Sequence, residues 1–371
     1  MFTSLKKWLA QKPFGDTWHK FQKNGIAFFL YGALKAQTLI PAVAGRNGVM
    51  GKVLEKNGIK RLFRLYSNHL ITNAKMLEFY SNRLLQYSAK VKKLRLVIDW
   101  TTLQENFMLL SISLITKKGR TIPIAYDGYK QGELGEGRSQ SSIEEDLLKK
   151  IIETIPMPSR KRITVIADRG FDRPDLAELL ISLKVNFVIR VCSGKYITVE
   201  GREIEIAKKI ISKGESYDFG NVIYTKSRKV ELRFIACWDK KMKDPWFIIT
   251  NLSSHTVKDI LHEYSLRWEI ESMFKSKKNA QVGMSWKYAK LTTIDRWLRF
   301  VFLITILFQF LADVGIFCDD DISIIKRYTP VANPKRRIFS IYNLALKVIK
   351  GLGRIFNIFI NQFDELIIRP V

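Results

Sequence analysis

Residues 94–126 read LRLVIDWTTLQENFMLLSISLITKKGRTIPIAY, and this stretch decides the fold. Its apolar runs predict three strands, which are Leu94–Asp99, Phe107–Ile115 and Thr121–Tyr126. A polar turn at Lys117–Arg120 separates the second strand from the third. Because consecutive strands with short links pair in an antiparallel way, the stretch predicts a three-stranded meander.

The chain after this meander alternates between helical and strand patterns. A polar, glycine-rich loop follows at 131–140, and then two expected helices alternate with two expected strands. In chain order these elements are Ser142–Ile155, Arg162–Asp168, Pro174–Lys184 and Asn186–Val191. The order β-β-β-α-β-α-β predicts an α/β fold, in which a mixed sheet carries helices on its faces.

The rest of the chain divides around this core. We expect a helical, basic N-terminal region at 1–92 that is a candidate for DNA binding, although no helix-turn-helix motif is legible in it. The core then occupies 93–191 and 256–317 and is interrupted at 192–255 by a β-rich insertion too long for a plain loop. A basic C-terminal region follows at 318–371.

The charge of the chain predicts its class of partner. Lysine and arginine total 62 residues against 35 aspartates and glutamates, which gives a net charge of +27. A field of that sign favours nucleic acid as a partner, ahead of an anionic membrane. The apolar run Phe300–Phe317 is interrupted by Gln309 and Asp313, so it predicts a buried core helix rather than a membrane span. The spacing of the cysteines and histidines predicts neither a disulfide framework nor a zinc site.

One stretch, YSLRWEIESMFKSKK at Tyr264–Lys278, combines an acid with cations on one predicted helix. At about 100° per residue, one face of this helix gathers Tyr264, Arg267, Glu271, Lys275 and Lys278. A metal-binding carboxylate beside phosphate-binding cations has this composition. The alternative is a solvated helix face that carries an ordinary Arg267–Glu271 pair four residues apart.

Two aspartates extend the hypothesis of a metal site. Asp99 and Asp168 each lie at the carboxyl end of a predicted strand, where ligands of open α/β sheets gather. With Glu271 arriving from a helix, three carboxylates could hold two magnesium ions for phosphodiester chemistry. The nearby acids Asp127, Glu144, Glu145, Asp172 and Asp175 are instead expected to be turn, capping or solvated residues.

Three blocks in this order resemble the DDE transposases of bacterial insertion sequences. The blocks are VIDWTTL around Asp99, VIADRGFDRPDL around Asp168, and the Tyr-x2-Arg-x3-Glu-x6-Lys spacing of Tyr264, Arg267, Glu271 and Lys278. More narrowly, they resemble the group that carries the YREK signature, family four of the insertion sequences. The resemblance implies a ribonuclease-H-like core in which Asp99, Asp168 and Glu271 form the catalytic, metal-binding triad.

The same resemblance implies the reaction and the partners. A water activated by Mg²⁺, with Mn²⁺ as an alternative, would nick the transposon end, and the freed 3′-hydroxyl would attack target DNA. The resemblance implies that Tyr264, Arg267 and Lys278 bind phosphates near the cut end, and the nearby basic residues Lys275 and Arg169 are further candidates for DNA contacts. A homodimer in the synaptic complex and a bacterial cytoplasmic, nucleoid-associated location are expected, without membrane attachment. Trp238 and Trp246 are candidates for stacking on a flipped base, although Trp246 fits simple packing better.

Two other functions remain open from the sequence. An enzyme with the same core could cut DNA without joining it, as a structure-specific nuclease does. The chain could also be a non-catalytic nucleic-acid-binding protein derived from a transposase.

Overall fold

The computed structural model describes residues 1–104, 106–115, 121–207, 210–226, 229–278, 288–319, 324, 327–328 and 341–352. Side chains at positions 90, 272, 275–278, 319, 341 and 352 are outside this description. The predicted turn at Lys117–Arg120 also lies outside the described residues, as does most of the predicted basic C-terminal region.

A single ten-stranded sheet runs through the molecule in the order β3-β2-β1-β4-β5-β10-β9-β8-β6-β7. Its strands are β1 (Leu94–Thr102), β2 (Phe107–Ile115), β3 (Thr121–Lys130), β4 (Ile163–Ala167), β5 (Asn186–Arg190), β6 (Tyr196–Val199), β7 (Arg202–Glu205), β8 (Ser216–Tyr224), β9 (Val230–Cys237) and β10 (Trp246–Thr250). The first three strands form the predicted antiparallel meander, and β4 and β5 continue it in parallel from β1. The fold class is therefore confirmed as a mixed, ribonuclease-H-like sheet.

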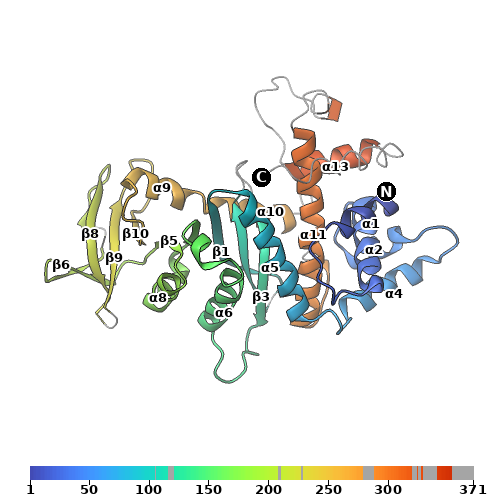
Figure 1. Cartoon of the computed structure of the whole chain (residues 1–371), viewed down its shortest axis with the longest axis horizontal. Helices are drawn as coiled ribbons and strands as arrows, with labels where there is room; N and C mark the ends of the chain where they lie inside the picture. The colour runs from blue at the N-terminus through green and yellow to red at the C-terminus, as the bar shows by residue number, and fades with distance from the viewer. Residues whose placement is uncertain are drawn as a thin grey trace.

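The predicted β-rich insertion extends the same sheet. Strand β10 pairs antiparallel with β5, and β9, β8 and β6 follow it outward (Figure 1). Strand β8 carries a register shift between Asp218 and Asn221, and β7 pairs with β6 at the outer edge of the sheet.

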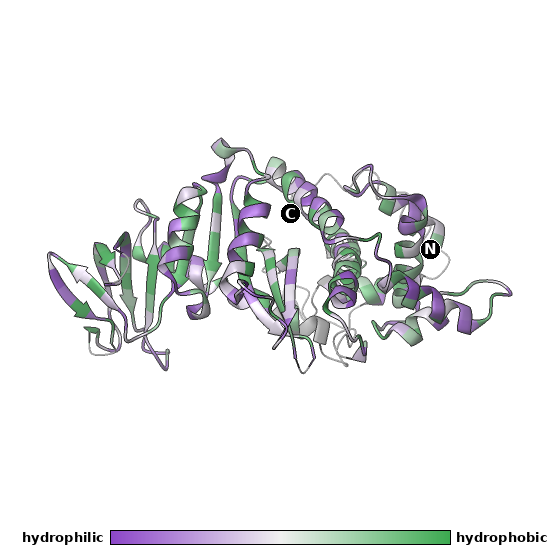
Figure 2. Cartoon of the chain, turned by 90° about the horizontal axis from the view of Figure 1, so that it is seen from below, coloured by the Kyte–Doolittle hydropathy of each residue, from purple (hydrophilic) through white to green (hydrophobic). Residues whose placement is uncertain are grey.

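Helices cover both faces of the sheet because its central strands are apolar on both sides (Figure 2). On β4 and β5, Val165 and Phe187 belong to the main core, which also contains α8 (Pro174–Ser182). Their neighbours Ile166 and Val188 point to the opposite face and form a second cluster with α9 (Val257–Ser265). The other helix between parallel strands, α6 (Gln140–Ile152), packs on β3. It begins two residues before the predicted Ser142, because Ser139 and Ser142 form its capping box.

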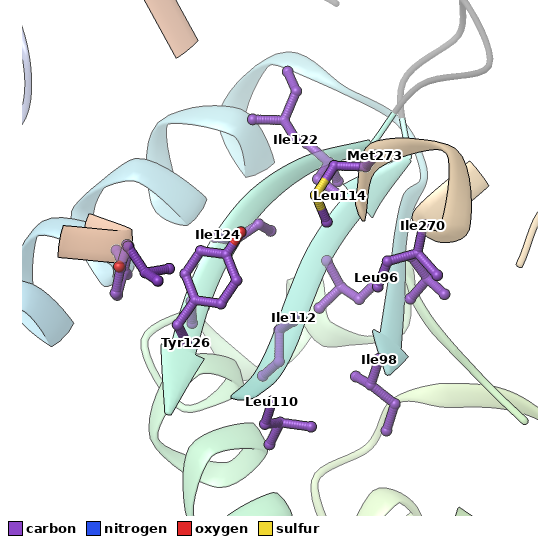
Figure 3. Close-up of a cluster of buried hydrophobic side chains, with 14 of the residues drawn as sticks. Leu96, Ile98, Leu110, Ile112, Leu114, Ile122, Ile124, Tyr126, Ile270 and Met273 are labelled. Carbon is purple, nitrogen blue, oxygen red and sulfur yellow. The ribbon is translucent and has the colours of Figure 1, made fainter. Parts of the chain in front are cut away.

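A cluster of aliphatic side chains attaches α10 (Trp268–Lys278) to the meander (Figure 3). Ile270 and Met273 of α10 are fully buried with Leu96 and Ile98 of β1 and Leu114 of β2. Burying such side chains stabilises each by about 1.5–3 kcal/mol, so the start of α10 is held firmly over β1.

A long apolar helix, α11 (Ile294–Asp319), stands between the sheet and the N-terminal helices (Figure 1). Its length and composition would suffice for a membrane span, but 83% of its apolar window is buried within the molecule. The predicted buried core helix is therefore confirmed, and its cap is Thr293 rather than Thr292, since Thr293 Oγ1 accepts the Arg296 amide. Helix α13 (Ile341–Leu352) packs against α11.

The N-terminal region is helical, as expected, although the sequence analysis gave no bounds for its helices. These are α1 (Phe2–Ala10), α2 (Lys20–Ala36), α3 (Pro41–Gly48), α4 (Glu55–Tyr66) and α5 (Asn73–Lys90). Helix α5 packs on β3, whereas α1, α2 and α4 lie on the far side of α11 from the sheet (Figure 1). Short elements, α7 (Met157–Arg160) and η1 (Arg169–Phe171), flank β4.

Candidate active site

The two predicted strand-end aspartates lie on neighbouring parallel strands. Leu94 pairs with Ile163 and Val97 pairs with Ile166, so the same register brings Asp99 level with Asp168. Asp99 is half-buried within β1, and Asp168 directly follows β4. The Asp168 carboxylate also caps η1 by accepting the Gly170 amide at 2.8 Å. Capping uses one of its oxygens, so the capping and catalytic interpretations of Asp168 are compatible.

The predicted continuous helix over Tyr264–Lys278 is wrong. Helix α9 ends at Ser265 and α10 begins at Trp268, with a turn at Leu266–Arg267. This break places Arg267 at the junction of the two helices rather than in the middle of one face. Its side chain is only 9% exposed, and its Nη2 donates a 2.8 Å hydrogen bond to Glu271 Oε1.

Arg267 also faces Asp99, with 4.0 Å between Nη1 and Oδ2. The Arg267–Glu271 pair expected by the alternative interpretation therefore exists. Its Arg267 side chain is largely buried and faces Asp99 within β1, so the pair does not lie on a solvated helix face. The turn between α9 and α10 therefore places Arg267, from the third sequence block, beside Asp99 of the first block.

The charges of Asp168 and Glu271 both act on the Asp99 carboxyl. Burial raises the pKa of Asp99 to about 7, with further upward contributions from the negative charges of Asp168 and Glu271. The positive charge of Arg267 opposes this rise. A carboxylate with such a raised pKa is stabilised in its charged form when a cation joins the group.

Tyr264 supports this arrangement from α9. Its side chain is 2% exposed, and its ring meets that of Trp246 edge-on, with 4.8 Å between centroids. Burial raises the pKa of the Tyr264 hydroxyl, while the nearby guanidinium groups of Arg267 and Arg190 lower it. Arg190, at the end of β5, was missed by the sequence analysis, because nothing in its own strand marks it as close to Tyr264.

An ion-pair group anchors α9 beside β1. Glu263, next to Tyr264, is 5% exposed and accepts hydrogen bonds from Lys93 Nζ at 2.7 Å and from Arg95 Nε at 2.7 Å. Arg95 Nη2 adds a third bond at 2.9 Å. These contacts join the helix that carries Tyr264 to the strand that carries Asp99.

The fit of a divalent metal depends on the carboxylate oxygens of Asp99, Asp168 and Glu271. Hard carboxylate oxygens are the ligands that Mg²⁺ prefers, and mutual repulsion between three carboxylates is relieved by a dication. Within the described part of the chain, no three Asp, Glu, His or Cys side chains are close enough together to hold an ion. Arg267, paired with Glu271 and facing Asp99, occupies the place of the cation in this arrangement.

The structure describes the side chains of only some of the cations that were predicted to contact DNA. Arg169 is exposed on η1, directly after Asp168. Lys275 and Lys278 belong to α10, but their side chains lie outside the described residues. Two other arginines near the sequence blocks bond to the protein backbone. Arg160 donates to the Ile155 carbonyl at 2.8 Å, and Arg162 donates to the Val91 carbonyl at 2.9 Å.

The acids set aside from the site have other partners. Asp172 is buried and accepts hydrogen bonds from the Cys192 amide and the Tyr224 hydroxyl. Glu144 was expected to be solvated or a cap, and that expectation is wrong: it is 1% exposed and accepts a 2.6 Å hydrogen bond from Trp100 Nε1. Glu145 lies near Arg173, at 3.5 Å.

The remaining set-aside acids and the two tryptophans also have structural contacts. Asp127 accepts the Gly128 amide, and Asp175 lies in the first turn of α8. Trp238 donates to the Met242 carbonyl at 3.2 Å, and Trp246 packs on Tyr264, as its simple packing interpretation predicted.

Comparison with known proteins identifies one part of the chain. Residues 137–307 match the model of the transposase DDE domain. The match includes Asp168 and Glu271 but begins after Asp99, so the place of Asp99 in the site rests on its register with β4 and its pKa. No curated protein matches the sequence.

Proposed function

We propose that this chain, which carries a transposase DDE domain over residues 137–307, is a DNA transposase that cuts an insertion sequence at its terminal inverted repeats and joins the ends to target DNA. The observation that carries the proposal is the position of Arg267, which bonds Glu271 at 2.8 Å and lies 4.0 Å from Asp99, on the strand that pairs in parallel with the one before Asp168. Asp168 and Glu271 come from distant parts of the sequence, and the charges of both act on Asp99 and on Arg267.

The triad is assigned as the metal site. Asp99, Asp168 and Glu271 would hold Mg²⁺ or Mn²⁺, and two such ions would supply activation of an attacking oxygen and stabilisation of a leaving oxygen in phosphodiester chemistry. Hydrolysis of one phosphodiester bond at the transposon end leaves a 3′-hydroxyl. That hydroxyl then attacks a phosphorus of target DNA, and the target strand leaves with its own 3′-hydroxyl.

The remaining signature residues bind the DNA backbone. Arg267 contacts the phosphate next to the cut and exchanges its partner Glu271 for that phosphate. Tyr264, which is buried, holds Arg267 and Arg190 in position for the same phosphate. Lys278, the last position of the YREK signature of insertion-sequence family four, extends the contact along the strand, and the basic residues Arg169 and Lys275 add to it.

The wider assignment follows from the same proposal. The protein acts in the bacterial cytoplasm on the nucleoid, as a homodimer that brings two transposon ends together. Its net charge of +27 supports a DNA partner, because phosphate contacts supply most of the affinity of such complexes.

An end-labelled duplex that carries the inverted repeat tests the proposal directly. We expect full-length protein with Mg²⁺ to yield both nicked ends and strand-transfer products, and Asp99→Ala and Asp168→Ala to yield neither. Cleavage without joining would identify a nuclease instead. Binding without cleavage, or variants that cleave as the wild type does, would refute the triad.

A further inference from the structure

A buried carboxylate connects the two segments that carry Asp99 and Asp168. Glu144 of α6 is 1% exposed, and its Oε1 accepts a 2.6 Å hydrogen bond from the indole N–H of Trp100, the residue after Asp99. Its Oε2 forms an ion pair at 2.5 Å with Arg173, five residues after Asp168. The two oxygens of one side chain therefore hold one partner from β1 and one from the loop that follows β4.

This bridge lies on the side of the sheet away from the candidate metal ligands. Successive side chains of a strand point to opposite faces, so Trp100 faces α6 while Asp99 faces Arg267. The sheet thus separates Glu144 from any ion or phosphate that Asp99 binds. Glu144 can act on the site only through the backbone of the residues that it holds.

A ring of four side chains fixes the Glu144 carboxylate in place. Gln140, one turn earlier on α6, donates to Glu144 Oε1 at 3.4 Å and accepts a 3.1 Å hydrogen bond from the Tyr129 hydroxyl of β3. The Tyr129 ring meets the Trp100 ring edge-on, with 5.6 Å between centroids. Buried networks whose polar groups are satisfied in this way are rigid, so the bridge can transmit a fixed distance.

The sheet itself does not fix the distance between the two aspartates. The parallel pairing of β1 with β4 ends at Val97 and Ile166, and Asp99 and Asp168 each lie two residues beyond that last pair. A buried ion pair is a poor source of stability, because apolar residues of the same volume often stabilise a protein as well or better. What the bridge adds at this place is a fixed geometry for the ends of two strands.

We propose that Glu144 is a positioning residue that sets the separation of Asp99 and Asp168, and with it the kind of divalent ion that the site accepts. The inference rests on the proposed function for the metal site alone. Mg²⁺ requires nearly ideal octahedral geometry at about 2.0–2.1 Å, whereas Ca²⁺ accepts irregular shells at about 2.3–2.6 Å. Strand ends that are free to move apart should therefore lose Mg²⁺ before they lose Ca²⁺.

Competition of Mg²⁺ and of Ca²⁺ against Mn²⁺, on full-length protein without DNA, tests the proposal without any catalysis. Electron paramagnetic resonance of the free Mn²⁺ reports both affinities. We expect Glu144→Gln to weaken Mg²⁺ binding by about tenfold, because it loses the charge that holds Arg173. Ca²⁺ binding should weaken by less than about threefold.

A second variant tests the other end of the bridge. Trp100→Phe keeps a ring beside Tyr129 but loses the N–H that Glu144 accepts. It should shift the ratio of Mg²⁺ to Ca²⁺ affinity in the same direction as Glu144→Gln. The double variant should be little worse than Glu144→Gln, because both changes open one bridge and their effects are not additive.

Asp218→Asn is the matched control. Asp218 of β8 forms a partly buried ion pair with Arg233 of β9, at 2.5 Å, in the outer part of the sheet. This variant should lose stability and keep the wild-type ratio of Mg²⁺ to Ca²⁺ affinity, because a smaller folded fraction lowers both affinities equally. Circular dichroism would verify that each variant remains folded.

Two results would overturn the assignment of Glu144 alone. One is a folded Glu144→Gln whose affinity ratio equals that of Asp218→Asn, and the other is a double variant whose losses add. Mg²⁺ binding that Asp99→Asn does not weaken would refute the proposed metal site and this inference together. A wild-type protein that binds Mg²⁺ through Asp99 and never cuts DNA would refute the proposed function and leave this inference standing.

Discussion

The guanidinium of Arg267 donates a 2.8 Å hydrogen bond to the carboxylate of Glu271 and lies 4.0 Å from that of Asp99. One protein cation thus lies among the acids that are proposed to bind metal. Under the proposed function, a dication that binds Glu271 would compete with this bond, so Arg267 would lower metal affinity in the absence of DNA. A phosphate that accepts the guanidinium would then release Glu271 to the metal.

Metal titration of two variants checks this competition. We expect Arg267→Gln to bind Mn²⁺ several-fold more tightly than the wild type, as measured by electron paramagnetic resonance of the free ion. Glu271→Gln should bind at least tenfold more weakly, because it loses a ligand. Both should lose DNA cleavage.

The exposed Arg202 provides the control for this titration, because Arg202→Gln removes the same charge far along the sheet. Its Mn²⁺ affinity and cleavage should match those of the wild type. Unchanged or weakened Mn²⁺ binding in Arg267→Gln would contradict the competition.

The raised pKa of Asp99 predicts a pH dependence of stability in metal-free protein. The folded-state pKa of about 7 exceeds the ordinary value of 3.8, so the stability that Asp99 contributes is fully present below 3.8 and is lost as pH rises through 7. Asp99→Asn should therefore be more stable than the wild type at pH 8, by about 2 kcal/mol, with little of this gain at pH 4. Urea unfolding in EDTA at both pH values measures the difference, and an equal effect at both would show that Asp99 titrates normally.

The proximity of Asp99 to Asp168 was predictable from sequence, because each follows an apolar run that forms a strand of a parallel pair. The register of β1 with β4 brings Asp99, which lies within β1, level with Asp168, which follows β4. The break before α10 was not predictable, since Leu266 keeps αR backbone angles and Leu266–Arg267 carries no glycine or proline. Hydrophobic periodicity alone does not reveal a turn whose residues are also compatible with a helix.

Arg190 and the bounds of the N-terminal helices were missed for different reasons. Arg190 reaches Tyr264 only because β10 and α9 fold back beside β5, which is a tertiary relationship. Helix α2 is buried on most of its surface, from Gly25 to Leu34, so it lacks the polar face that marks an amphipathic helix. In both places the missing information lies in packing rather than in local pattern.

The contacts of Glu263 predict that α9 is anchored electrostatically. Burial alone would raise the pKa of Glu263, but hydrogen bonds from Arg95 and Lys93 bring it below its usual value of 4.5. The stability that the group contributes is thus present above pH 4.5 and lost as pH falls below it. Glu263→Gln should cost about 2–3 kcal/mol of unfolding free energy at pH 7 and less at pH 3.

Urea unfolding of Glu263→Gln can be compared with that of Glu203→Gln, which breaks an exposed ion pair with Lys226. The exposed pair should contribute nothing measurable. Cleavage by Glu263→Gln should also fall, because Tyr264 on the same helix loses its position. A stability equal to that of the wild type would show that Lys93 and Arg95 find other partners.

Asp168 and Asp172 lie four residues apart and are predicted to have different roles, Asp168 in catalysis and Asp172 in stability. Asp172 is 6% exposed, and its carboxylate joins the Cys192 amide at 2.8 Å, Lys195 at 3.0 Å and the Tyr224 hydroxyl. Asp168 is half-buried and faces the coupled acids. Asp172→Asn should cost about 2–4 kcal/mol of unfolding free energy, because it leaves the Lys195 cation without its charge partner.

Cleavage activity should show the reverse pattern, because the Asp168 variant should lose activity and the Asp172 variant should keep it. Folded Asp172→Asn should cut the transposon end at a rate within threefold of the wild type, since the residue touches no reacting group. Asp168→Asn should lose at least three orders of magnitude in rate while keeping its stability within about 1 kcal/mol, because it retains the cap on the Gly170 amide. Rates normalised to the folded fraction decide the matter: an inactive but stable Asp172→Asn, or an active Asp168→Asn, would mean that the second acid of the triad has been assigned to the wrong residue.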